Sequence, residues 1–197
     1  MAIPRIYRKA QEVQANFDFT DLASGNAFTS FFGTQSKSTA GTSHALLTQT
    51  TFSDAKESVR NTAGTTTLTF ESAPFNLPRT VKGTAYFNLG VYSNNAANWL
   101  WAQISKYDGA TQTNISVSQA YQSAVETKKI LMQIPCSEVK INPGEKLRFV
   151  ISQVVPGGGG DELTIGIDPQ GRTGSRLSDT SGANTILKLD TPFKIVL

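Results

Sequence analysis

The longest clean alternation of apolar and polar residues spans residues 79–92, and it constrains the fold more than any other feature of the sequence. Successive side chains of a β-strand point to opposite faces, so every second residue lies on one face. Lys82, Asn88 and Tyr92 fall on the polar face. We therefore expect a central strand of the hydrophobic core. The apolar or small residues on its core face are Val81, Gly83, Ala85, Phe87, Leu89 and Val91.

A Pro-Gly pair separates two more apolar segments in the second half of the chain. Pro143 presets the first central position of a turn, and Gly144 accepts the positive φ that follows. Residues 129–134 form the apolar run before the turn, and residues 147–151 alternate between apolar and polar after it. The sequence predicts that these two strands form the hinge of an antiparallel sandwich.

Short apolar or β-branched segments recur along the rest of the chain, and turn residues separate them at the spacing of about 8–12 residues that is typical of a sandwich or barrel. Residues 53–60 and 121–127 are the two segments that suggest a turn of helix, and residues 111–119 suggest an edge strand or a loop. The predicted fold is an all-β, antiparallel β-sandwich of the jelly-roll type. An immunoglobulin-like sandwich is the alternative, although its cysteine pair is missing. The other expected strands are 16–20, 27–32, 43–52, 65–70, 99–106, 161–168, 185–189 and 193–197.

The chain has 197 residues, enough for one well-buried core and few for two ordinary domains. We expect an extended N-terminal arm over residues 1–14, which is basic and carries Arg5, Tyr7 and Arg8, followed by a single domain over residues 15–197. The first residues lack the apolar stretch of a secretory signal, and no run approaches the roughly 18 apolar residues of a membrane span. The expected location is therefore not a membrane.

The net charge of +3 is spread along the chain rather than gathered in a Lys/Arg stripe, which argues against a specific nucleic-acid partner. Catalysis by a serine or cysteine nucleophile would have to use His44, the only histidine, together with Asp54 or with Cys136, the only cysteine. No Gly-x-Ser-x-Gly motif surrounds a serine. The expectation is a protein that is not an enzyme and that needs no cofactor.

Acidic residues gather in the late loops at Asp161, Glu162, Asp168 and Asp179. A carboxylate pair could hydrolyse a glycoside, and Asp161, Asp168 or Asp179 could contribute to a calcium site. Neither arrangement has a supporting motif, so solvated loop acids are the simpler interpretation and no metal site is predicted.

Trp99 and Trp101 are two positions apart, so they share one face of a strand. Packing in the core or in a subunit interface is the simpler interpretation of the pair. The alternative is an exposed platform on which sugar rings stack. Arg172 and Arg176, in a long polar loop, are candidates for pairing with acids of an adjacent subunit, and a solvated loop is the competing interpretation.

Three segments resemble small β-sandwich structural proteins of tailed bacteriophages. Residues 3–9 followed by 17–21 resemble the start of such virion proteins, residues 166–172 resemble a Gly-x-Asp-Pro-x-x-Arg loop in them, and residues 191–197 resemble their ending. The resemblance implies a virion structural protein, of the capsid decoration or cement type.

From this resemblance we expect a protein made in the host cytoplasm and carried in the virion. Its expected partners are copies of itself, a trimer being favoured, and a major capsid protein. Arg5, Tyr7, Arg8, Arg172 and Arg176 are the expected contact residues. The alternative function is a carbohydrate- or receptor-binding module of a phage tail or capsid appendage, with Trp99 and Trp101 as its platform.

Overall fold

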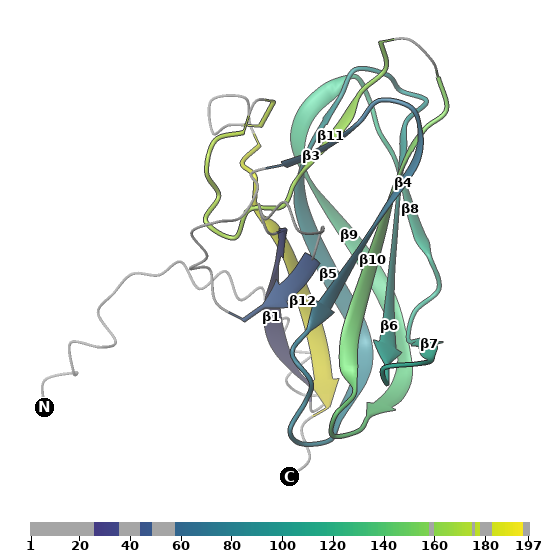
Figure 1. Ribbon diagram of the computed structural model, residues 1–197, viewed down its shortest axis with the longest axis vertical. Coiled ribbons are helices and arrows are strands. Elements are labelled where there is room, and N and C mark those ends of the chain that lie inside the picture. Colours follow the sequence, from purple (N-terminus) through teal and green to yellow (C-terminus); the bar gives the residue numbers. More distant parts are fainter. Residues whose placement is uncertain are drawn as a thin grey trace, which may run out of the picture.

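The computed structural model describes residues 26–35, 44–48, 58–157, 160–174, 176–177 and 183–194. These segments form a two-layered β-sandwich of jelly-roll-like topology (Figure 1). None of their residues is helical, and so none contributes a helix that could cross a membrane. The strands are β1 (Asn26–Gln35), β2 (His44–Leu47), β3 (Ser58–Asn61), β4 (Gly64–Ser72), β5 (Arg79–Ser93), β6 (Trp99–Tyr107), β7 (Gln112–Asn114), β8 (Gln119–Gln122), β9 (Glu126–Ile141), β10 (Lys146–Val155), β11 (Leu163–Gly166) and β12 (Leu187–Lys194).

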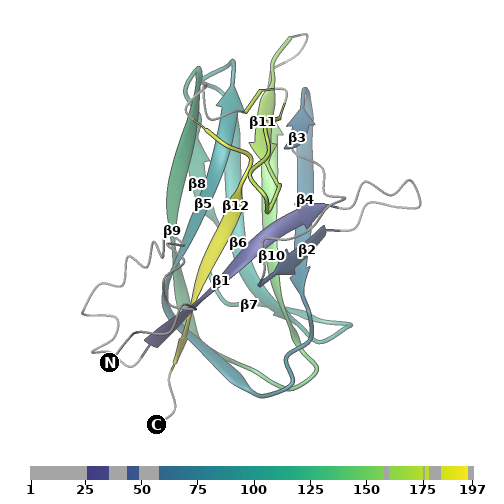
Figure 2. The same ribbon diagram turned by 90° about the vertical axis from the view of Figure 1, so that its left-hand side faces the viewer.

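The first layer is built around β5, the strand that the longest alternation predicts. β9 pairs along one edge of β5 in antiparallel fashion. β12 and β11 pair with successive parts of the other edge, β1 follows β12, and β3 follows β11. Figure 2 shows β9, β5, β12 and β1 side by side. The expectation of a central strand over residues 79–92 is confirmed.

The second layer has β10 at its centre, between β4 and β6. β7 and β8 pair with successive parts of the far edge of β6. The two layers are linked through β1, which pairs with β2, and through β2, which pairs with β4. The β2–β4 pair is parallel, so the sheet is mixed rather than purely antiparallel as the sequence suggested.

The core lies between the two layers and is formed by the inward-facing residues of both. In β10, buried and partly exposed residues alternate strictly, as the period-2 pattern predicts. Phe87 of β5 and Phe149 of β10 meet edge to face across the core, with their ring centroids 4.7 Å apart. Both side chains are completely buried, so this contact joins the central strands of the two layers.

The Pro-Gly turn connects the two layers, because β9 pairs with β5 while β10 pairs with β4 and β6. Gly144 has a φ of 86°, the left-handed conformation that glycine adopts without strain. The Glu145 carboxylate accepts a 2.7 Å hydrogen bond from the Asn142 backbone N–H and so closes the turn. The predicted hinge is therefore a corner between the two sheets.

Several sequence-based boundaries are wrong. Residues 121–127 do not form a helical turn: they belong to the end of β8 and the start of β9. Residues 58–60, predicted as helical, lie in β3, and the strands expected at 185–189 and 193–197 are largely one strand, β12. The predicted arm over residues 1–14 and the first predicted strand, 16–20, lie outside the described residues.

Candidate binding surfaces

The two tryptophans lie on the outer face of the second layer, not in the core. Leu100 and Ala102 of β6 point inward and are buried, which places Trp99 and Trp101 on the opposite face. The two indole rings are nearly parallel, at 24°, with centroids 6.3 Å apart. The Trp101 side chain is 41% exposed, and Trp99 is partly exposed. The pair is thus available to a partner or ligand.

The register of the sheet determines which side chains surround the indoles. Trp99 lies opposite Val154 of β10, and Trp101 lies opposite Ser152. On the next strand, Ser152 lies opposite Thr67, and the two hydroxyl oxygens are 3.0 Å apart. We use the name tryptophan face for this patch, defined by Thr67, Trp99, Trp101, Gln103, Ser152 and Val154. It contains aromatic, aliphatic, hydroxyl and amide groups and no ionisable side chain.

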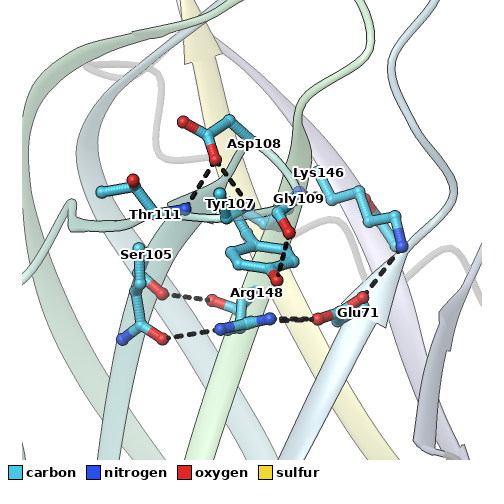
Figure 3. A network of polar contacts seen from close by, with 12 residues as sticks. Glu71, Ser105, Tyr107, Asp108, Gly109, Thr111, Lys146 and Arg148 are labelled. Atoms are coloured by element: carbon cyan, nitrogen blue, oxygen red, sulfur yellow. Dashed lines mark hydrogen bonds and ion pairs between the residues drawn. The ribbon is translucent and has the colours of Figure 1, made fainter.

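A network of charged residues borders the tryptophan face at one end of β10 and β4 (Figure 3). The Arg148 guanidinium pairs with Glu71 on the adjacent strand and lies over the Tyr107 ring, 3.5 Å from its centroid. Arg148 also donates to the Gln112 side-chain oxygen, and Lys146 donates to Glu71 at 2.9 Å.

Glu71 is the acceptor at the centre of this network. Its partial burial alone would raise its pKa, but the hydrogen bonds from Arg148 and Lys146 outweigh the burial, so the pKa lies below its usual value. The carboxylate therefore stays charged and matched by its two cationic neighbours.

The segment 166–172 forms a compact loop in which the motif residues have structural roles. Asp168 is completely buried, and its carboxylate accepts hydrogen bonds from the backbone N–H groups of Gln170 and Arg172, at 3.0 and 2.9 Å. The Arg172 guanidinium donates to the same carboxylate at 2.8 Å. Gly171 has a φ of 66°. The motif residues therefore shape this loop.

A second buried acid, Glu162, holds two arginines from different parts of the chain. Arg176 donates two hydrogen bonds of 3.1 Å to its carboxylate, and Arg60 of β3 lies 3.0 Å from it. Thr164 donates a further bond of 2.9 Å. Burial would raise the Glu162 pKa, but the hydrogen bonds from Arg176 and Thr164 and the charge of Arg60 lower it below its usual value.

Arg172 and Arg176 thus pair with acids of their own chain. The sequence left two interpretations open, acids of an adjacent subunit or a solvated loop, and within the chain itself the two arginines pair with Asp168 and Glu162. Their side chains remain partly exposed, 34% for Arg172 and 46% for Arg176. A part in a subunit contact stays a prediction for both. Arg5, Tyr7 and Arg8 lie outside the described residues.

The candidates for catalysis and metal binding do not come together in the described part of the chain. His44 packs against Phe70, with ring centroids 5.0 Å apart. Cys136 is partly buried, and this burial raises the pKa of its thiol to about 11, so the thiol is protonated at neutral pH. Asp161 accepts a hydrogen bond from the Asn95 side chain at 2.9 Å. Among the described residues, Asp161 and Asp168 do not belong to any cluster of side chains that could hold a metal ion. Asp54 and Asp179 lie outside the described residues.

Sequence reasoning missed the Glu71–Arg148 pair and the Glu162 cluster. Glu71 and Arg148 are 77 positions apart, and Glu162, just before β11, is distant in the sequence from Arg60 of β3. Only the strand register brings them together. The alternating pattern predicts the faces of each strand but not which strands are neighbours.

No protein-family model matches the chain, and no curated protein matches it. The chain is similar in structure to an α-amino acid ester hydrolase, with a TM-score of 0.55 and 9% sequence identity over 82% of this chain and 36% of that one. A CocE/NonD family hydrolase from Staphylococcus aureus gives a TM-score of 0.47, with 13% identity over 85% of this chain and 37% of that one. For a structure of infectious bursal disease virus, the TM-score is 0.35, with 14% identity over 87% of this chain and 37% of that one.

These comparisons correct the prediction that the chain is not an enzyme. That prediction is contradicted, because the structure it resembles at a TM-score of 0.55 is a hydrolase. The missing catalytic motif, on which the prediction rested, is therefore no ground for excluding activity. The chain spans 36% of the length of that hydrolase, and at 9% identity the likeness shows a shared fold. The fold common to the two chains is the β-sandwich.

Proposed function

We propose that the protein is a structural component of a virus particle, of the capsid decoration or cement type. It would pack against copies of itself, as a trimer, and against a major capsid protein. Support comes from the resemblance of three segments to phage virion proteins and from the sandwich fold, which exposes two broad sheet faces and a set of end loops. The proposed location is the virion.

The observation that carries the proposal is the prearranged set of arginines at the loop end of the sandwich. The buried carboxylates of Asp168 and Glu162 fix Arg172, Arg176 and Arg60, while the three arginine side chains stay partly exposed. Side chains that are already fixed lose little conformational entropy when a partner binds. Such a rigid, polar surface suits a contact that repeats over a particle.

The test begins with the mass of the purified protein, measured by light scattering over a concentration series. We expect a discrete oligomer, with a trimer as the expected size. Purified virus particles are then separated on a density gradient and probed with an antibody against the protein. Co-sedimentation with the particles supports the proposal, whereas a protein found only in the free fraction contradicts it.

Two variants locate the contact. Deleting residues 1–14 tests the proposed arm and is expected to abolish binding to particles that lack the protein. Arg176→Ala tests the loop end and is expected to weaken binding. Lys128→Ala, which changes an exposed lysine on β9, serves as the control. Unchanged binding by both test variants would contradict the proposed contact elements.

A further inference from the structure

We infer that the tryptophan face is a binding site for a neutral carbohydrate chain built of hexopyranose units. This inference concerns a different surface from the loop end, and it does not rest on the proposed virion role.

Both tryptophans are at least partly exposed to solvent. The chain has two tryptophans, and both lie on one outer face, although burying a large aromatic side chain in the core would have been favourable. Adjoining exposed aromatic side chains form an apolar patch, and apolar patches rimmed by polar residues mark interaction or ligand-binding surfaces. The two indoles therefore indicate a ligand that buries them.

The two indoles form a nearly flat aromatic surface. The two rings are inclined by only 24° and their centroids are 6.3 Å apart, so they provide adjoining surfaces of similar orientation. A hexopyranose presents C–H groups on the faces of its ring and hydroxyls around its rim. Stacking the C–H faces on the indoles removes apolar area from water on both sides. Two neighbouring rings can thus accept neighbouring sugar units of one chain.

Polar side chains lie beside the indoles. A hydroxyl offers one donor and two acceptor positions, so the Thr67–Ser152 pair keeps capacity for further hydrogen bonds after its mutual contact of 3.0 Å. The Gln103 side-chain amide is held by the Ser116 carbonyl at 3.2 Å, and the Gln122 amide by the Ala96 carbonyl at 3.1 Å. Hydroxyls and positioned amides are suitable partners for the hydroxyl rim of a sugar.

The charge of the tryptophan face selects among the possible ligands. The tryptophan face has no ionisable side chain, and the charged pair at its border, Arg148 with Glu71, is internally matched. A phosphate-bearing ligand would find no unmatched cation on this face. A protein partner would favour a continuous apolar centre, whereas here hydroxyl groups lie directly beside the indoles. A neutral ligand rich in hydroxyls matches the surface best.

The test uses the full chain and three soluble probes: cellohexaose, maltohexaose and N-acetyl-chitohexaose. Because both tryptophans lie in the proposed site, intrinsic fluorescence reports on it directly. We expect at least one probe to shift the emission to shorter wavelength in a saturable way, with a dissociation constant of about 1 mM or tighter. Calorimetric titration should give the same constant.

Variants test whether the indoles are responsible. Trp101→Ala is expected to weaken binding at least about tenfold, and Trp101→Phe, which keeps an aromatic ring, to weaken it less. Leu131→Ala is the matched control: it removes a 56% exposed apolar side chain from the outer face of the other layer and should leave binding unchanged. Thermal unfolding of each variant verifies that it is folded.

Three outcomes would overturn the inference. One is an unchanged emission spectrum with all three probes, and the second is wild-type affinity in Trp101→Ala. The third is a change of oligomeric mass in Trp101→Ala without sugar binding by the wild-type chain, which would make the face an interface between copies. A protein that binds sugar but never sediments with particles would contradict only the virion role.

Discussion

Arg148 lies over the aromatic ring of Tyr107 while the same guanidinium pairs with Glu71 on the neighbouring strand. The two contacts require different properties of one group: a flat surface for the ring and a fork of N–H donors for the carboxylate. Guanidinium combines both, and an ammonium group does not. The arrangement ties β4, β6 and β10 together on their solvent-facing side.

Replacing Arg148 with lysine should therefore destabilise the fold even though the charge is kept. We expect a loss of about 1 kcal/mol in the free energy of unfolding, because the ring contact and the two-pronged pairing are both weakened. Urea unfolding measures the change. Lys82→Ala, which breaks an exposed pair with Glu138, is the comparison and should cost less than about 0.5 kcal/mol. Equal costs for the two variants would show that Arg148 acts only as a surface charge.

Glu162 should make stability depend on pH in the acidic range. Its pKa is lower in the folded chain than its ordinary value of 4.5, so the unfolded chain binds its proton first as the pH falls. The stability that this carboxylate contributes is present above about pH 4.5 and is lost as the pH falls through the lower, folded-state pKa. Denaturant titrations at several pH values test this.

The matched variant for this experiment is Glu162→Gln, which keeps the size of the side chain. We expect it to be less stable than the wild type at pH 7. Because glutamine does not take up a proton in this range, the variant should also lose less stability between pH 5 and pH 3. If the free energy of unfolding depended on pH in the same way for the two chains, Glu162 would not be the source of the acid sensitivity.

Gly166 should tolerate no larger residue. A Cβ atom built on it would lie 2.5 Å from the backbone of Thr185, which packs against the strand at this point. Gly166→Ala is therefore expected to cost about 2 kcal/mol, because backbone on one side has to move. Gly64→Ala is the comparison: it has a φ of 67° but open space around it, and it should cost about 1 kcal/mol. Thermal unfolding of the two variants should rank them in this order.

Cys136 should react slowly with thiol reagents while the chain is folded. Its burial raises the pKa of the thiol to about 11, so little of the reactive thiolate exists at pH 8. We expect labelling by a maleimide to be much slower in the native protein than in 6 M urea, with mass spectrometry as the measurement. Rapid labelling of the native protein would show that β9 opens readily at this position.

The sequence alone predicted the sandwich and its central strand, because residues 79–92 alternate without interruption. It misassigned residues 121–127, where Tyr121 pairs with Leu100 of β6. That short polar segment has no strong preference of its own, and a pairing partner some twenty residues away decides its conformation. Tertiary contacts of this kind override local propensity.

The tryptophans show where sequence reasoning about the site stopped. The alternation in β6 places Trp99 and Trp101 on one face and Leu100, Ala102 and Ile104 on the other, but both faces begin with large apolar residues. Hydrophobicity alone could not decide which face enters the core. The packing of the second layer decides it, because Leu100 and Ile104 are completely buried there.

The strand β1 lies beside β12, and the Ser30 hydroxyl donates a 2.5 Å hydrogen bond to Asp190, 160 positions later. The ribosome synthesises a chain from the N-terminus, so β1 emerges long before β12, the strand that covers this edge. During that interval its N–H and C=O groups toward β12 have no partner in the sheet, and such an edge readily recruits strands of other molecules. The yield of native protein during synthesis should therefore depend on how well this edge of β1 is shielded, for example by a chaperone, until β12 has left the ribosome.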